Sequence, residues 1–73
     1  MTQHFKIKDL GMGDWSITPL TDHGIKKIRY TYEGYPSGDD RLFMEGNTLV
    51  IVHQGVAENL CNYFDWLDNR NRR

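Results

Sequence analysis

The fold is decided by residues 41–68, RLFMEGNTLVIVHQGVAENLCNYFDWLD, in which a β-hairpin leads directly into an amphipathic helix. The pair Gly46-Asn47 separates two apolar runs, and such a pair is favoured in tight hairpin turns. A turn at this pair places residues 42–45 opposite residues 48–51. The sequence therefore predicts an antiparallel hairpin of defined register.

The two faces of this hairpin differ in character. One face is wholly apolar and is predicted to be core: Leu42, Met44, Leu49 and Ile51. The other face is mixed, with Phe43 beside Val50 at its centre. A solvent-exposed face does not need these two apolar side chains, so we expect the helix, a loop or another protein to cover it.

Helical spacing begins after Gly55 and continues to Asp68. Apolar side chains recur every three or four residues and form the stripe expected of a helix packed on a sheet. The stripe consists of Val56, Leu60, Tyr63, Phe64 and Leu67. Trp66 falls about a quarter turn from this stripe and is predicted to lie on the flank of the helix.

The first third of the chain is predicted to add strands. His4–Lys8 alternates polar and apolar residues, as a half-buried strand does. Residues 9–14 contain two glycines and are predicted to form a loop. Residues 15–20 suit either an edge strand or a single helical turn capped by Thr18, and we favour the strand.

Residues 25–33, IKKIRYTYE, are rich in β-branched and aromatic residues and predict another strand. That strand would turn Tyr30 toward the core and Lys27 outward. A turn at residues 21–24 would join it to the preceding strand in a first hairpin.

Together these elements predict an α+β fold, an antiparallel sheet of four or five strands with one C-terminal helix packed on it. The 73 residues suit a single domain (1–73), with residues 70–73 as a frayed basic tail, and contain no internal repeat. The predicted core comprises Ile7, Ile28, Tyr30, Leu42, Met44, Leu49, Ile51, Leu60, Phe64 and Leu67.

The charge, the cysteine content and the apolar content of the chain exclude several classes of function. The net charge of −1 and the pI of about 6.2 give no overall attraction to nucleic acid or to anionic membranes. Cys61 is the single cysteine, so no intramolecular disulfide can form and a reducing, cytoplasmic location is expected. We expect no signal peptide and no membrane span, because no apolar run approaches the ~20 residues that a span needs.

Catalytic and metal chemistry find little support. Four side chains are potential metal ligands: His4, His23, His53 and Cys61. None of them forms the short paired spacing of structural zinc sites, so neither a metal nor a cofactor is predicted. Cys61 with His53 would place a nucleophile in mid-helix, away from the helix N-terminus that lowers a thiol pKa. Asp39-Asp40 is explained by turn formation, and we expect no enzymatic activity.

A small domain of mixed charge with surplus apolar side chains predicts a protein-binding module. The expected contact residues are Lys6, Lys8, Lys27, Arg29, Phe43, Val50 and Trp66. The alternative is a single-stranded nucleic-acid-binding module, in which the four cations of that set share one strand face. The lack of excess positive charge weighs against this alternative.

In length, single-domain build and residue mix, the chain resembles the small regulators that bacteriophages make to act on host RNA polymerase. The resemblance covers the whole chain in size and character, and no short motif carries it, so it transfers no binding residue. It implies contact with a polymerase subunit, blocked promoter-dependent initiation and reduced termination.

Overall fold

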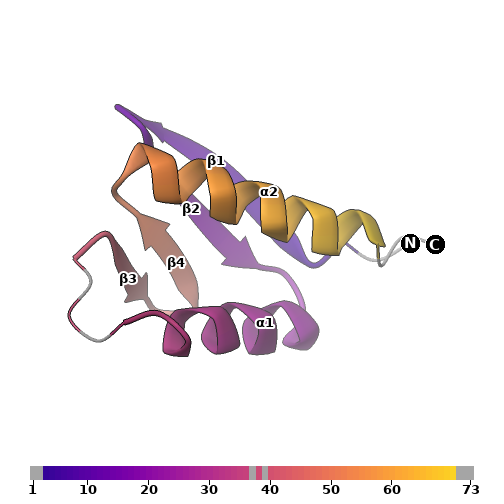
Figure 1. Cartoon of the computed structure of the whole chain (residues 1–73). Helices are drawn as coiled ribbons and strands as arrows, with labels where there is room; N and C mark the ends of the chain where they lie inside the picture. Colours follow the sequence, from indigo (N-terminus) through magenta and orange to yellow (C-terminus); the bar gives the residue numbers. More distant parts are fainter. Residues whose placement is uncertain (1–2, 37, 39, 71–73) are drawn as a thin grey trace.

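The computed structural model describes residues 3–36, 38 and 40–70, whose elements follow the order ββαββα (Figure 1). The elements are β1 (Phe5–Gly11), β2 (Asp14–Pro19), α1 (Asp22–Glu33), β3 (Leu42–Glu45), β4 (Thr48–Ile51) and α2 (Gln54–Arg70). The strands form one antiparallel sheet in the order β1-β2-β4-β3. The predicted α+β fold, with a four-stranded antiparallel sheet and a C-terminal helix, is confirmed.

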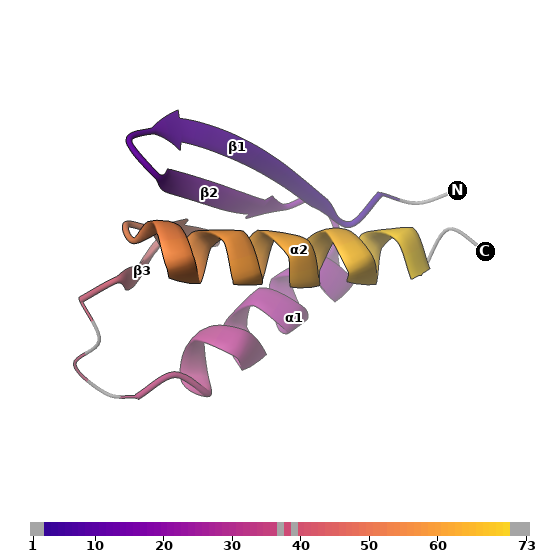
Figure 2. The same ribbon diagram turned by 45° about the horizontal axis from the view of Figure 1, so that its top comes forward.

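Both helices lie on one face of the sheet, as Figures 1 and 2 show. α1 packs on β2, β3 and β4, whereas α2 packs on β1, β2 and β4. The unit ββα thus occurs twice, with the second strand of each half at the centre of the sheet. No helix in the described part of the chain covers the opposite face, which we call the open face.

The second hairpin has the predicted register, with Phe43 opposite Val50 and Leu42 opposite Ile51. Gly46 opens its turn with a φ of 64°, a conformation that favours glycine. Alternation of side chains along the strands therefore turns Leu42 toward the helices and Phe43 toward the open face.

The first hairpin differs from the prediction, because β1 pairs with β2. Its turn is Met12-Gly13, where both residues have positive φ values of 56° and 82°, as a type I′ turn requires. Residues 14–19 form strand β2, which confirms a strand over a helical turn. The expectation of an edge strand is wrong, because β2 pairs with β1 on one side and with β4 on the other.

The predicted strand at residues 25–33 is wrong, since this segment belongs to helix α1. Thr21 is the N-cap residue, and its Oγ1 accepts a hydrogen bond of 3.1 Å from the backbone N–H of Gly24. The cap and the burial of Gly24 and Ile28, four residues apart, outweigh the β propensity of the aromatic residues. As a consequence Tyr30 is 78% exposed, so its assignment to the core is also wrong.

The core lies between the sheet and the two helices. Its buried members are Phe5, Ile17, Ile28, Leu42, Leu49, Ile51, Ala57, Leu60, Cys61, Phe64 and Leu67. The rings of Phe5 and Phe64 meet edge to face with centroids 4.8 Å apart, which joins β1 to α2. Of the other residues predicted for the core, Ile7 and Met44 are partly buried at its edge.

His4 connects three elements at one end of the molecule. Its backbone N–H donates to Asp68 Oδ1 in α2 at 2.7 Å, and its carbonyl accepts from the N–H of Leu20 at 2.8 Å. Its ring Nδ1 lies 2.6 Å from Thr21 Oγ1 at the start of α1. Gly24 approaches the carbonyl of His4 so closely that a Cβ at this position would collide with that oxygen.

Some predicted features fall outside the described residues. Arg72 and Arg73 of the predicted tail and Asp39 of the predicted acidic pair are among these, while Arg70 is the last residue of α2. In the segments that the structure does describe, neither helix is long and apolar enough to cross a membrane.

Gly24→Ala is expected to lower the free energy of unfolding by about 1–3 kcal/mol, because the new Cβ would force α1 away from His4. Gly55→Ala is the matched control in the first turn of α2, where the nearest atoms of His53 would lie at an ordinary 3.6 Å. The control should be neutral or more stable by up to about 1 kcal/mol. Urea denaturation measures both, and equal stability of the two variants would contradict the close approach.

Asp68→Ala is expected to cost about 1–3 kcal/mol of unfolding free energy, because the N–H of His4 loses its buried acceptor. The exposed residue Asp65 on the same helix provides the control, and Asp65→Ala should change stability by less than about 0.5 kcal/mol. Thermal unfolding followed by circular dichroism compares them. Similar melting temperatures for the two variants would show that the link between His4 and Asp68 contributes little.

Candidate functional site

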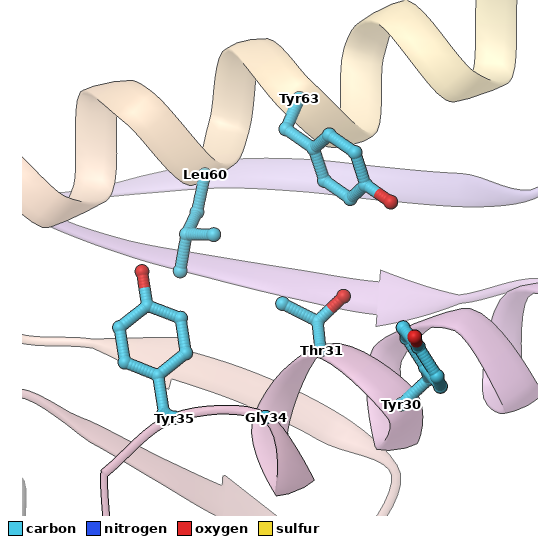
Figure 3. Close-up of a pocket in the computed structure, with 6 residues that line it drawn as sticks. All are labelled: Tyr30, Thr31, Gly34, Tyr35, Leu60 and Tyr63. Carbon is cyan, nitrogen blue, oxygen red and sulfur yellow. The ribbon is translucent and has the colours of Figure 1, made fainter.

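A hollow in the surface lies between the two helices (Figure 3). It is a shallow, mostly apolar pocket of about 330 Å³, lined by Tyr30, Thr31, Gly34, Tyr35, Leu60 and Tyr63. Figure 3 shows Leu60 and Tyr35 facing each other on one side, while Tyr63 extends from α2 toward Thr31. We call this hollow the interhelical groove. An apolar surface edged by hydroxyl groups suits the binding of a partly apolar ligand.

The α1 side of the groove is basic and aromatic. His23, Lys27 and Tyr30 follow each other at intervals of four and three residues, so they lie along one side of the helix. Together with Lys26 they line a second hollow of about 360 Å³, which shares Tyr30 with the interhelical groove. The two hollows are therefore neighbouring parts of one surface.

The α2 side of the groove is also aromatic and basic. Tyr63, Trp66 and Arg70 lie at intervals of three and four residues. The rings of Tyr63 and Trp66 are stacked with centroids 6.4 Å apart, and Arg70 Cζ lies 5.4 Å from the centroid of the Trp66 ring. This cation–π contact holds the 54% exposed indole on the flank of α2, where the sequence placed it.

The acidic residues of the two helices are placed differently with respect to the groove. On α2, Glu58 and Asp65 fall on the side opposite Leu60 and Tyr63. On α1, Asp22 and Glu33 lie four and seven residues from Lys26 and therefore share its side of the helix. The described residues that line the two hollows nevertheless include no acidic residue.

The open face of the sheet is a second, separate surface. It carries Lys6 and Lys8 on the edge strand β1 and Phe43, 43% exposed, on the opposite edge strand β3. Val50 lies between its register partners Ser16 and Phe43 and is only 7% exposed, although no described helix covers this face. Val50 thus offers little surface to a partner.

The structure places most of the predicted contact residues on one or the other of these two surfaces, and Arg29 on neither. The expectation that Lys6, Lys8, Lys27 and Arg29 share a strand face is wrong, because the latter two belong to α1. Arg29 moreover lies on the side of α1 opposite Lys27. The sheet therefore does not present these four cations as one row to which a single-stranded nucleic acid could bind.

Two residues of the groove were missed by sequence reasoning. Tyr30 was assigned to the core and Tyr63 to the apolar stripe of the C-terminal helix, yet both line the groove. The helical spacing from His23 through Lys27 to Tyr30 was the signal that could have identified the α1 side. Recognition of Thr21 as a helix N-cap residue would have favoured this helical spacing over the strand-like alternation of residues 25–33.

The other reactive groups do not form an obvious centre. Burial, followed by the nearby charges of Asp65 and Asp9, raises the pKa of Cys61 to about 11, which is the opposite of what a thiolate nucleophile needs. The rings of His4 and His23 lie 4.5 Å apart. Within the described ranges, no three histidine, cysteine or acidic residues come together in a way that could hold a metal ion.

Comparison with known protein families, with curated proteins and with solved structures finds no match to this chain.

His23 makes stability depend on pH. Burial, with the nearby charges of His4, Lys27 and Lys26, lowers the pKa of His23 below its ordinary value of 6.5. The folded state favours neutral His23, whereas the unfolded chain takes up the proton near the ordinary pKa. The contribution of neutral His23 to the free energy of unfolding is thus fully present above pH 6.5 and is lost as the pH falls through the lowered pKa.

We expect the free energy of unfolding to decrease when the pH is lowered from about 7.5 to about 5.5, and His23→Gln should reduce this slope. Urea denaturation of both proteins across that range provides the measurement. An unchanged slope in the variant would mean that His23 does not titrate differently in the folded protein.

Proposed function

We propose that the chain is a non-enzymatic protein-binding module whose contact surface is the interhelical groove. The observation that supports this most directly is the concentration of exposed aromatic residues on both sides of the groove, namely Tyr30, Tyr63 and Trp66. Tyrosine, tryptophan and arginine contribute a large share of binding energy in protein interfaces. The arginine of this surface is Arg70, which packs over Trp66.

The groove suits a protein partner better than the open face does. On the open face Val50 is buried, which leaves Phe43 of β3 as its exposed aromatic residue, and two strands separate Phe43 from the lysines of β1. In the groove, by contrast, apolar and aromatic side chains lie next to the cations of the neighbouring hollow. An apolar centre within a polar rim is the usual anatomy of an interface.

The resemblance in size and residue mix to phage-made regulators makes bacterial RNA polymerase the first partner to test. This proposal places the protein in a reducing cytoplasm, in keeping with Cys61 as its single cysteine. Binding to such an enzyme needs no catalytic group on the small chain. The chain needs only to occupy a surface of the polymerase that another ligand of the enzyme would otherwise contact.

The test is capture from a bacterial lysate by the immobilised protein, followed by mass spectrometry and by binding assays with purified RNA polymerase. Tyr30→Ser removes an exposed aromatic residue that lines the groove, and Trp66→Ser removes one beside it. Each should weaken binding of the captured protein by about 2 kcal/mol, or about 30-fold in Kd. Phe43→Ser, a matched change on the open face, should leave Kd within about twofold.

Thermal melts first establish that the three variants fold like the original protein. Loss of binding in Phe43→Ser with retention in both groove variants would transfer the site to the open face. Steeply salt-dependent binding of a thymidine oligonucleotide, stronger than that of any captured protein, would favour the single-strand nucleic-acid alternative.

A further inference from the structure

The hollow on the α1 side of the groove is lined by basic residues. Lys26 and Lys27 belong to its described lining, which includes no acidic residue, and Arg70 lies on the other side of the groove. On α2, Asp65 lies on the side of the helix away from the groove, whereas on α1 Glu33 shares the side of Lys26 without lining the hollow. In a protein of net charge −1, the paired lysines make the field over this hollow more positive than that of the molecule as a whole. Such a field favours a ligand of negative charge.

The pocket between the helices sets the second property of the ligand. Its volume of about 330 Å³ is at the low end of ligand sites, and its walls are mainly apolar. A site of this size suits a single bulky side chain rather than a large cofactor. Because Tyr30 belongs both to this pocket and to the cationic hollow, the apolar group and the negative groups of the ligand must be close together.

The arrangement of the helices sets the shape of the ligand. Figure 2 shows α1 and α2 closest together at the start of α1 and the end of α2, and farther apart toward the other end. The pocket lies in the wider part, beside the second half of α1. A surface bounded by two helices in this way can take a third helix or an extended segment.

From these features we infer that the groove binds an acidic peptide segment with one bulky aromatic or aliphatic side chain. The apolar side chain enters the pocket between Leu60, Tyr35 and Tyr63, while neighbouring carboxylates lie against Lys26 and Lys27. This inference rests on the proposed function, because the segment is part of the protein partner. It adds the chemistry by which that partner is recognised.

A nucleic acid fits the same surface less well. Its phosphates repeat along the whole strand and would extend past Lys26 and Lys27 to Glu33 on α1, and to Glu58 and Asp65 on the outer side of α2. A peptide can instead confine its carboxylates to the few positions that face cations. The limited number of cations also gives little of the counterion release on which nucleic-acid binding depends.

The experiment is selection from a phage-displayed library of random peptides about twelve residues long, followed by fluorescence anisotropy of the enriched peptides. Peptides selected by the unmodified protein should carry a surplus of aspartate and glutamate beside a tryptophan, phenylalanine or leucine. The double variant Lys26→Glu/Lys27→Glu should bind them at least about tenfold more weakly, a loss of about 1.4 kcal/mol. The double variant Lys6→Glu/Lys8→Glu makes the same change in net charge on the open face and should retain binding.

An empty selection, enriched peptides that are neutral or basic, or equal losses in the two double variants would each overturn the inference. Stronger binding of a thymidine oligonucleotide of similar length to the groove would overturn it in favour of nucleic acid. Lysate capture that depends on Tyr30 and Trp66 but not on Lys26 and Lys27 would leave the protein-binding proposal standing and reject only the acidic segment. Lysate capture that depends neither on the two aromatic residues nor on the two lysines would reject both the groove as the protein-binding surface and the acidic segment as its ligand.

Discussion

The position of His4 fixes both helices relative to the sheet. Its backbone N–H is held by Asp68 near the end of α2, and its carbonyl accepts from Leu20 and presses against Gly24 near the start of α1. The two helices are therefore drawn together at this end and separate toward the other, as Figure 2 shows. The width of the groove at Leu60 follows from that constraint, since the sheet supports both helices from one side only.

The second hairpin and the C-terminal helix could be predicted because local and long-range preferences agree there. The turn at Gly46 allows one register, and that register brings Leu42 and Ile51 onto the same face. In the helix, burial of Leu60 and Phe64 follows the spacing of apolar residues. Where the turn, the register and the apolar pattern coincide, the sequence leaves few alternatives.

Residues 25–33 were wrongly assigned to a strand because their residue pattern fits both the two-residue period of a strand and the 3.6-residue period of a helix. Ile28 and Tyr30 share a face in a strand, whereas in a helix Ile28 turns inward and Tyr30 outward. The hydrogen bond from Gly24 to the cap residue Thr21 and the close packing of Gly24 on His4 select the helix. The second of these depends on a residue twenty positions earlier in the chain, which local reasoning cannot include.

The assignment of residues 25–33 to a strand also decided which residues of the candidate site could be predicted. Trp66 was placed correctly because its position follows from the period of a helix that was recognised. Lys27 and Arg29 were grouped with the lysines of β1 because a strand would have put all of them on one sheet. Once the segment is helical, Lys27 joins Tyr30 at the groove instead.

The repeated ββα unit has a consequence for how the chain folds. Each half has only one hairpin and one helix, and β2 and β4 pair across the centre of the sheet through residues 15–17 and 49–51. Until these segments meet, Ile17 and Leu49 lack each other as register partners, and a lone two-stranded hairpin is at best marginal in water. Neither half is a self-sufficient folding unit, so nucleation must join segments distant in sequence, and the chain is expected to gain its structure in a single all-or-none step.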